Sequence, residues 1–320
     1  MKMTCRLFLV LAVGLSLLGC NRSDKKRIGV VPKAISHAFW QTVHAGAIAA
    51  AREADVEIEW KGPATETDFS RQIEIVDAMI NSHIDGIVLA PTESTSLIGV
   101  VDRARSNGIP VTIFDSGLNS ENYVSFVSTN NYEAGVLAAR TLAKLIANEG
   151  QIAIVKMVPG ASSTMQREQG FEDTILKEFP NIEIVDFKYC RSDPAIALSV
   201  TENMLTAHPD LDGLFASGEP ATIGTAKGLR SRNRYGDVEF VSFDFTDALD
   251  ADIRDGVISA TVVQEPFQIG YQAVMTIVAS LNGETPNKRI DTNTRVVTAA
   301  NIDDAEISAL LHPDLAEYLD

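Results

Sequence analysis

The sequence lacks the motifs that mark most catalytic and metal sites. It contains no nucleophile elbow, phosphate-binding loop, dinucleotide fingerprint or His-Glu-x-x-His zinc motif. Its five histidines are scattered, and no group of Cys and His residues has the spacing of a zinc site. The acidic residues between Asp244 and Asp252 lack the alternating ligands and central glycine of a calcium loop. We therefore expect neither a metal nor a cofactor.

Positive charge is also in short supply. The chain has 43 acidic and 27 basic residues and a formal net charge of −16. Because nucleic-acid binding needs a basic surface, this balance argues against DNA or RNA as a partner. Hydrophobic residues make up 45% of the chain, which is enough for the cores of two domains.

The N-terminus has the pattern of an export signal. Two basic residues precede the apolar stretch 7–18, which is too short for an ordinary membrane span, so residues 1–19 are predicted to be a signal peptide. The stretch ends in Leu17-Leu18-Gly19-Cys20, which resembles the bacterial lipobox. That resemblance implies cleavage before Cys20, acylation of its thiol and amino group, and a short polar tether over 20–27. A plain signal peptide that happens to contain this cysteine is the alternative.

Cysteine is too scarce for a disulfide framework. Cys5 lies in the predicted signal and Cys20 in the lipobox-like motif, so Cys190 is the one thiol expected to remain. A single thiol cannot form an internal disulfide, and the fold must therefore depend on its hydrophobic cores.

Apolar runs alternate with helical patterns along the rest of the chain. The expected strands are 28–31, 56–60, 86–90, 111–114, 124–127, 152–157, 182–187, 213–216, 238–243, 259–263 and 294–298. The expected helices are 39–54, 69–81, 94–107, 134–145, 165–178, 194–207, 219–229, 247–254, 265–281 and a polar helix at the C-terminus. This alternation predicts an α/β fold with parallel sheets, and its renewal after residue 130 predicts two similar lobes.

Polar and aromatic side chains recur where predicted strands end. They are Lys33, His37, Phe39 and Trp40 after the first strand, Asp115 and Ser116 after 111–114, Gly218 and Glu219 after 213–216, Asp244 after 238–243, and Gln264 after 259–263, with Arg167 in a first helical turn. Ligands of open α/β sheets bind at this carboxyl edge. Carboxylate, amide and cationic groups bind sugar hydroxyls, while aromatic faces stack on the C–H faces of a sugar. The set predicts a carbohydrate-like pocket.

The order and spacing of several short motifs resemble one known family. They are Ile84-Asp85-Gly86-Ile87-Val88-Leu89-Ala90-Pro91, Gly108-Ile109-Pro110-Val111, Phe114-Asp115, Arg167-Glu168-Gln169-Gly170-Phe171, Leu205-Thr206-Ala207-His208-Pro209-Asp210-Leu211-Asp212-Gly213, Phe243-Asp244 and Gln264. The chain is similar to the type I periplasmic sugar-binding proteins, the ribose-receptor branch that shares its fold with the core of the lactose repressor. A repressor is not expected, since the first strand follows the lipobox-like motif directly.

The resemblance implies two Rossmann-like lobes with parallel sheets joined by a three-segment hinge. The N-terminal lobe would comprise 28–129 plus 265–292, and the C-terminal lobe 130–264 plus 293–320. The hinge would lie near Thr129-Asn130, Gln264-Glu265 and 291–293.

The resemblance also implies a function. A monosaccharide or similar polyhydroxylated ligand would bind between the lobes, and a monomeric lipoprotein facing the periplasm or cell exterior would deliver it to the permease subunits of an ABC importer. By similarity, the ligand-binding residues would be Lys33, His37, Phe39, Trp40, Asp115, Arg167, Asp244 and Gln264.

Three departures bear on the ligand. Ser116 stands where many ribose receptors have Arg, Gly218 stands where they have Asn, and Ser192 lies near an aromatic position of their second domain. These changes suggest a roomier pocket and put ribose in doubt. Pro32-Lys33 and Phe114-Asp115-Ser116 also resemble the sub-branch that binds a furanose autoinducer and rhamnose. Lys33 beside Arg167 would suit a sugar acid, unless Asp115 and Asp244 neutralise both cations.

Two other functions remain open from the sequence. The same receptor could report a signalling ligand to a sensor protein instead of feeding an importer. A sugar-modifying enzyme that uses Asp115 and Asp244 is the least supported alternative.

Overall fold

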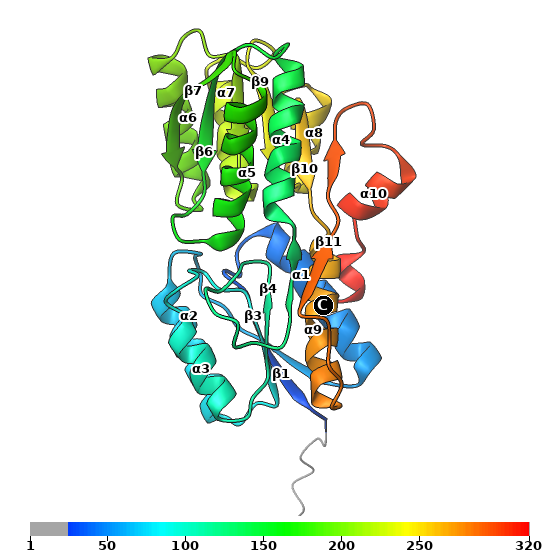
Figure 1. Ribbon diagram of the computed structural model, residues 1–320. Coiled ribbons are helices and arrows are strands. Elements are labelled where there is room, and N and C mark those ends of the chain that lie inside the picture. The colour runs from blue at the N-terminus through cyan, green and yellow to red at the C-terminus, as the bar shows by residue number, and fades with distance from the viewer. Residues whose placement is uncertain (1–24, 320) are drawn as a thin grey trace, which may run out of the picture.

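The computed structural model describes residues 25–319, which form two lobes, one above the other in Figure 1. The signal expected at residues 1–19 and the lipidation expected at Cys20 lie outside these residues. Within 25–319, none of the helices combines the length and the apolar character needed to cross a bilayer. The structure thus describes the two α/β series that follow the tether.

The first lobe is built on a parallel sheet of six strands in the order β2-β1-β3-β4-β5-β11. The strands are β1 (Arg27–Val31), β2 (Glu57–Trp60), β3 (Gly86–Leu89), β4 (Val111–Phe114), β5 (Phe126–Thr129) and β11 (Arg289–Thr292). The helices are α1 (Ala38–Ala54), α2 (Phe69–Asn81), α3 (Ile98–Ser106) and α9 (Pro266–Leu281). Because α2 and α3 cover one face and α1 and α9 the other, β3 and β4 are buried throughout.

The second lobe repeats this plan with the strand order β7-β6-β8-β9-β10-β12. The strands are β6 (Gly150–Lys156), β7 (Ile182–Tyr189), β8 (Gly213–Ala216), β9 (Glu239–Phe243), β10 (Ala260–Val263) and β12 (Arg295–Val297), of which β12 is antiparallel to β10. The helices are α4 (Asn131–Leu145), α5 (Ser162–Glu178), α6 (Pro194–Ala207), α7 (Glu219–Ser231), α8 (Asp250–Arg254) and α10 (Ala305–Leu311), with 3₁₀ turns η1 (Asp247–Leu249) and η2 (Leu315–Glu317). Helices α4 and α5 cover one face and α6 and α7 the other.

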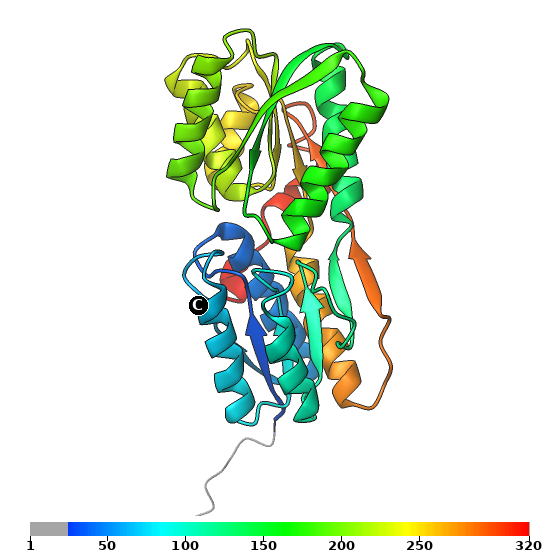
Figure 2. The same ribbon diagram turned by 60° about the vertical axis from the view of Figure 1, so that its left-hand side comes forward.

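The chain crosses between the lobes three times. It passes from β5 to α4, from β10 to α9, and from β11 to β12, and Figure 2 shows these segments side by side at one edge of the molecule. The lobe boundaries expected from the sequence stay a prediction. The last described residues also contact helices of the first lobe: the ring of Tyr318 packs 5.5 Å from that of Phe267 on α9, and Arg52 of α1 donates to the carbonyl of Glu317.

One matched pair of helices in each lobe packs unusually closely. A Cβ on Gly170 of α5 would lie 2.1 Å from the carbonyl oxygen of Tyr132 on α4, and one on Gly135 of α4 would lie 1.9 Å from the carbonyl oxygen of Arg167. Gly46 of α1 meets the carbonyl of Phe267 on α9 in the same way. Glycine is required here because only a residue without a side chain lets two helix backbones touch. This contact fixes the backbone that carries Arg167.

Some predicted elements have different bounds. The sequence missed β11, a short edge strand whose residues are at most half-buried and include two charges. The helix expected at 94–107 begins only at Ile98, and the one expected at 247–254 is a 3₁₀ turn followed by the short α8. For both helices, the first residues of the expected range form turns and the α-helix starts later.

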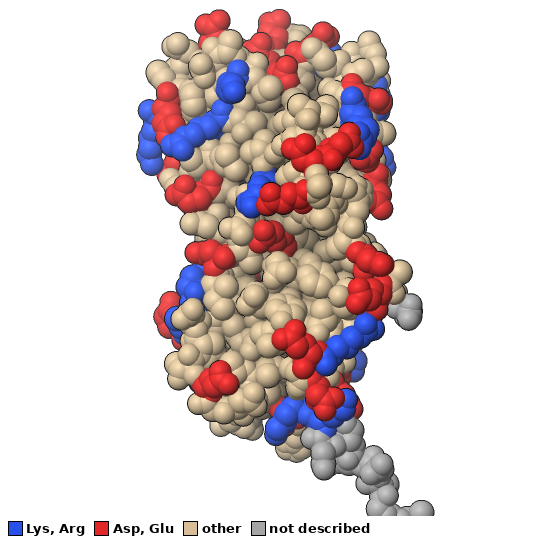
Figure 3. Space-filling view, turned by 90° about the vertical axis from the view of Figure 1, so that its right-hand side faces the viewer, with Lys and Arg blue, Asp and Glu red and all other residues tan. Residues whose placement is uncertain are grey.

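The face of the molecule in Figure 3 carries both signs of charge. Lys and Arg side chains lie among Asp and Glu there and do not gather into a basic patch. On this face the charges of opposite sign therefore lie close enough to offset one another.

Candidate functional site

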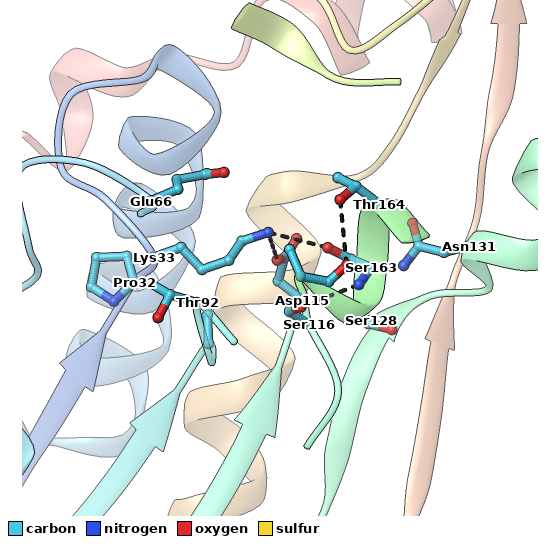
Figure 4. A network of polar contacts seen from close by, with 12 residues as sticks. Pro32, Lys33, Glu66, Thr92, Asp115, Ser116, Ser128, Asn131, Ser163 and Thr164 are labelled. Carbon is cyan, nitrogen blue, oxygen red and sulfur yellow. Dashed lines mark hydrogen bonds and ion pairs between the residues drawn. The ribbon is translucent and has the colours of Figure 1, made fainter. Parts of the chain in front are cut away.

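Lys33 lies at the carboxyl end of β1 and its ammonium group is buried between the lobes (Figure 4). Its Nζ is 3.0 Å from Oδ2 of Asp115, which follows β4, and donates to Oγ of Ser163 on α5 at 3.1 Å. Burial lowers the pKa of Lys33, but the carboxylates of Asp115 and Glu66 outweigh it and hold the pKa above its ordinary value. Lys33 is therefore charged, and it joins the first lobe to the second.

Asp115 and Asp244 occupy equivalent places in the two lobes. Each follows the fourth strand of its sheet, counted from the β2 or β7 edge, and each has a left-handed backbone, with φ of 56° and 68°. Asp is one of the few residues that tolerate this conformation. Backbone strain of this kind is maintained at functional sites, where it aims a side chain. Both carboxylates line the same cavity between the lobes.

Glu66, in the loop after β2, is a buried carboxylate with three polar neighbours. Trp40 Nε1 donates to its Oε1 at 2.9 Å, Ser192 Oγ of the second lobe donates to its Oε2 at 3.1 Å, and Nδ1 of His37 lies 3.6 Å from Oε1. Burial alone would raise the pKa of Glu66. The neighbouring Lys33 and His37 outweigh burial and lower the pKa to about 2. Burial likewise lowers the pKa of His37, and Glu66 outweighs it, so the net shift is upward.

The aromatic pair forms one wall of the cavity. The ring of Trp40 packs edge to face against Phe39 at 5.0 Å and against Phe114 at 6.1 Å between centroids. With its indole nitrogen bonded to Glu66, Trp40 is held in a single orientation. The packing and the hydrogen bond together hold this wall in place.

Arg167 projects from the first turns of α5 and is buried. Its Nη2 donates to Oδ1 of Asn131 at 2.8 Å, its Nη1 donates to the carbonyl of Ser217, and its guanidinium lies 3.4 Å from the ring centroid of Phe243. Its Nε has no partner among residues 25–319. One donor of this cation is thus available to a ligand.

Asp244 and Gln264 are linked to each other and to the hinge. Gln264 Nε2 donates to Oδ1 of Asp244 at 2.7 Å, and Thr129 Oγ1, at the end of β5, donates to Gln264 Oε1 at 2.8 Å. The backbone N–H of Glu219 donates to Oδ2 of Asp244. Burial raises the pKa of Asp244 in spite of the attraction of Arg167.

Glu219, at the start of α7, reaches across the cleft to the N-terminus of α1. Its carboxylate accepts hydrogen bonds from the backbone N–H groups of Ala38 at 3.2 Å and Phe39 at 2.9 Å. The N-cap residue of α1, His37, supplies no side-chain bond of its own. A residue of one lobe therefore caps a helix of the other, and the lobes are closed on each other.

All eight predicted ligand-binding residues line one cavity between the lobes, whose empty volume of about 340 Å³ is partly open to solvent. Within residues 25–319, no cluster of His, Cys, Asp and Glu could hold a metal ion. The structure brings the predicted residues together, while their role in binding a ligand stays a prediction.

Residues 28–285 match the model of the periplasmic binding protein domain. The chain belongs to that family. This periplasmic binding protein is 30% identical to the D-ribose/D-allose-binding protein of Pseudomonas aeruginosa over 297 residues, 89% of this chain and 92% of the relative. It is 26% identical to the ribose import binding protein of Bacillus subtilis over 280 residues, 87% of this chain and 90% of the relative.

Solved structures of sugar-transport binding proteins share the fold of this chain. A carbohydrate transporter solute-binding protein from Agrobacterium radiobacter in complex with D-arabinose superposes with a TM-score of 0.88 at 31% identity, covering 91% of this chain and all of that one. An ABC transporter solute-binding protein from Agrobacterium vitis with bound D-fucose gives 0.87 at 36% identity, covering 89% and 100%. The family and the fold expected from the motifs are confirmed.

Sequence reasoning missed Glu66 of the binding protein's cavity and the contacts that Glu219 and Ser192 make across the cleft. Glu66 lies in a polar loop whose sequence gives no sign of burial. Glu219 follows a strand, but its contact with α1 depends on how the lobes close. Ser192 reaches Glu66 only across the cleft. The strand-end rule had already placed Glu219 in the pocket set, and it points more weakly to the loop after β2 that carries Glu66.

The balance of charge in the cavity is negative. The two permanent cations, Lys33 and Arg167, face four acidic side chains, Asp115, Asp244, Glu66 and Glu219. Burial raises the pKa of Glu219 even though two N–H groups donate to it. A further anion would enter a site that already has more acidic than basic groups. The arrangement therefore disfavours a sugar acid, the ligand that Lys33 and Arg167 suggested by themselves.

Proposed function

We propose that the chain captures a neutral monosaccharide in its interlobe cavity and delivers it to the permease of an ABC importer. The observation that carries this proposal is the convergence of charged and amide side chains from both lobes on one cavity with a rigid aromatic wall. Such groups match the alternating donors, acceptors and C–H faces of a sugar. Relatives and solved structures whose names give a ligand include binding proteins for ribose, allose, arabinose and fucose.

Binding would couple to closure because the cavity has walls from both lobes. A ligand that contacts both lobes binds the closed state better than the open one and shifts the equilibrium by that difference in affinity. The partly unpartnered guanidinium of Arg167 and the Asp115 carboxylate, which pairs with Lys33, are the groups we assign to ligand hydroxyls. No step of this function requires bond making, and we assign the protein no catalysis.

We further propose that Cys20 is lipidated and holds the protein at the membrane as a monomer. The support is the lipobox-like Leu17-Leu18-Gly19-Cys20 and the polar tether that follows it. Two or more acyl chains anchor a protein stably where one chain is marginal. Replacing Cys20 with Ser should abolish incorporation of labelled palmitate, and equal labelling in the variant and the parent would refute the anchor.

The proposed function is tested by thermal shift against neutral pentoses and hexoses, deoxy sugars, polyols and sugar acids. The form that starts at Ser23 keeps every described residue. A ligand at 100 times its Kd adds about 2.7 kcal/mol to the free energy of unfolding, a shift of at least several degrees. We expect at least one neutral sugar to raise the melting temperature and no sugar acid to do so. If no neutral sugar raises the melting temperature, the proposal is refuted.

A further inference from the structure

A second cavity lies in the mouth of the cleft, outside the ligand cavity. Its empty volume is about 860 Å³, part of which is open to solvent. Thr67 and Phe69 line it from the first lobe, and Val158, Tyr189 and Arg191 from the second. Anything bound there would contact both lobes, like a ligand in the inner cavity.

One side chain lines both cavities. Glu66 borders each of them, and Ser192 of the second lobe donates a hydrogen bond to it across the cleft. The bonded pair Glu66–Ser192 is therefore part of the partition between the two cavities. A ligand that replaced the Ser192 hydroxyl as donor to Glu66 would extend from one cavity into the other.

The backbone on the second-lobe side of this partition is strained. Arg191 and Ser192 are successive non-glycine residues with φ of 56° and 60°. The hydrogen bonds from Cys190 N to the carbonyl of Lys156 and from Arg191 N to the carbonyl of Met157 hold this segment in place. Two consecutive left-handed residues are costly and persist where the surrounding structure maintains them for a function. Here they turn one residue to the outer cavity and the next to Glu66.

The lining of the outer cavity has the chemistry of a sugar subsite. The ring of Phe69 is 43% exposed, and Tyr189 is half-buried on the facing lobe. The polar groups of Glu66, Thr67 and Arg191 lie around them. Exposed aromatic rings beside a carboxylate and a guanidinium suit the C–H face and the hydroxyls of one more sugar ring.

We propose that the outer cavity is a subsite for the second ring of a disaccharide whose first ring occupies the inner cavity. This rests on the proposed function and widens its substrate class from monosaccharides to their glycosides, which would extend past the Glu66–Ser192 pair. The hydroxyl of the linked sugar would take over the hydrogen bond that Ser192 donates to Glu66.

Calorimetry on the full-length chain in a detergent that carries no sugar tests the subsite. The probes are neutral monosaccharides and, for the tightest binder, its disaccharides in both anomeric forms. We expect at least one disaccharide to bind. Phe69→Ala should weaken that disaccharide about tenfold and change the monosaccharide by less than twofold. Thr67→Trp should block the disaccharide by filling the outer cavity. Leu145→Ala, at an apolar position of similar exposure at the end of α4, is the matched control.

The outcomes separate the two proposals. Monosaccharide binding without any disaccharide binding overturns the subsite and leaves the proposed function standing. Disaccharide binding that Phe69→Ala and Thr67→Trp leave unchanged also overturns the subsite. If neither monosaccharide nor disaccharide binds, the proposed function fails as well.

Discussion

Glu219 offers the sharpest test of how the lobes close. Its carboxylate accepts two backbone hydrogen bonds at the N-terminus of α1, from the opposite lobe. Hydrogen bonds to a charged group contribute about 1.5–3 kcal/mol, and a helix N-cap about 1 kcal/mol. These bonds exist only while the lobes are together, so they stabilise the closed state over the open one.

Two substitutions of Glu219 should weaken closure by different amounts. Glu219→Gln keeps one acceptor oxygen and removes the charge, and we expect it to weaken closure by about 1 kcal/mol, which is about fivefold in affinity. Glu219→Ala leaves the N–H groups of Ala38 and Phe39 without that partner, and we expect a loss of about 2 kcal/mol, or roughly thirtyfold. Glu183→Gln removes an exposed charge from the start of β7 and serves as the control.

Affinity alone does not separate closure from direct contact, because Glu219 also lines the cavity. Small-angle X-ray scattering of the sugar-free protein makes the distinction, since a weaker closed state gives a larger radius of gyration. We expect the radius to increase in the order parent, Glu219→Gln, Glu219→Ala. Unchanged scattering in both variants would refute the cap as a closing contact, whatever happens to the affinity.

Three further predictions follow from the described contacts. The pKa of Glu66 is about 2 in the folded protein against 4.5 in the unfolded chain, so its stabilising contribution is complete above pH 4.5 and is lost as the pH falls towards 2. Urea titrations should show the parent losing about 3 kcal/mol more than Glu66→Gln over that range, and parallel curves would contradict the assignment. Arg167→Met should lower the free energy of unfolding by about 3 kcal/mol, because it leaves buried carboxylates without their cation. If urea unfolding shows a loss below about 1 kcal/mol, other groups stabilise those carboxylates and the reasoning is wrong. Gly170→Ala places a Cβ 2.1 Å from a carbonyl oxygen of α4 and should lower the free energy of unfolding by about 2 kcal/mol. Gly99→Ala, whose Cβ would have its nearest atom at 3.7 Å, is the control and should not destabilise the protein. Equal melting temperatures for the two variants would argue against the close helix contact.

The sequence was sufficient for most of the fold because the central strands are buried on both faces. Strands such as β3 and β4 are short, continuous apolar runs, which is the pattern typical of the interior of a parallel sheet. The edge strand β11 escaped prediction because its charged, partly exposed residues carry no such pattern. The pairing of the final Tyr318 with Phe267 was equally hidden, since it depends on where the chain ends in space.

The cavity was predictable to the extent that it obeys the strand-end rule. Lys33, Asp115, Asp244 and Gln264 all follow strands, and parallel topology brings strand ends to one edge. The contacts that cross the cleft were not predictable in this way. The bond from Ser192 to Glu66 joins loops 126 positions apart, and no local pattern in the sequence encodes how two lobes meet.

Those cross-cleft contacts change the expected energetics of capture. Direct contacts that join the lobes include Lys33 with Ser163, Ser192 with Glu66, and Glu219 with the end of α1. Each stabilises the closed state, so the ligand need supply only the remainder of the free energy of closing. Because apparent affinity is reduced by the fraction of molecules that are not competent to bind, a partly closed free protein binds more tightly than one that rests fully open. The same contacts must break before release, so the permease has to separate the lobes against them as well as against the sugar.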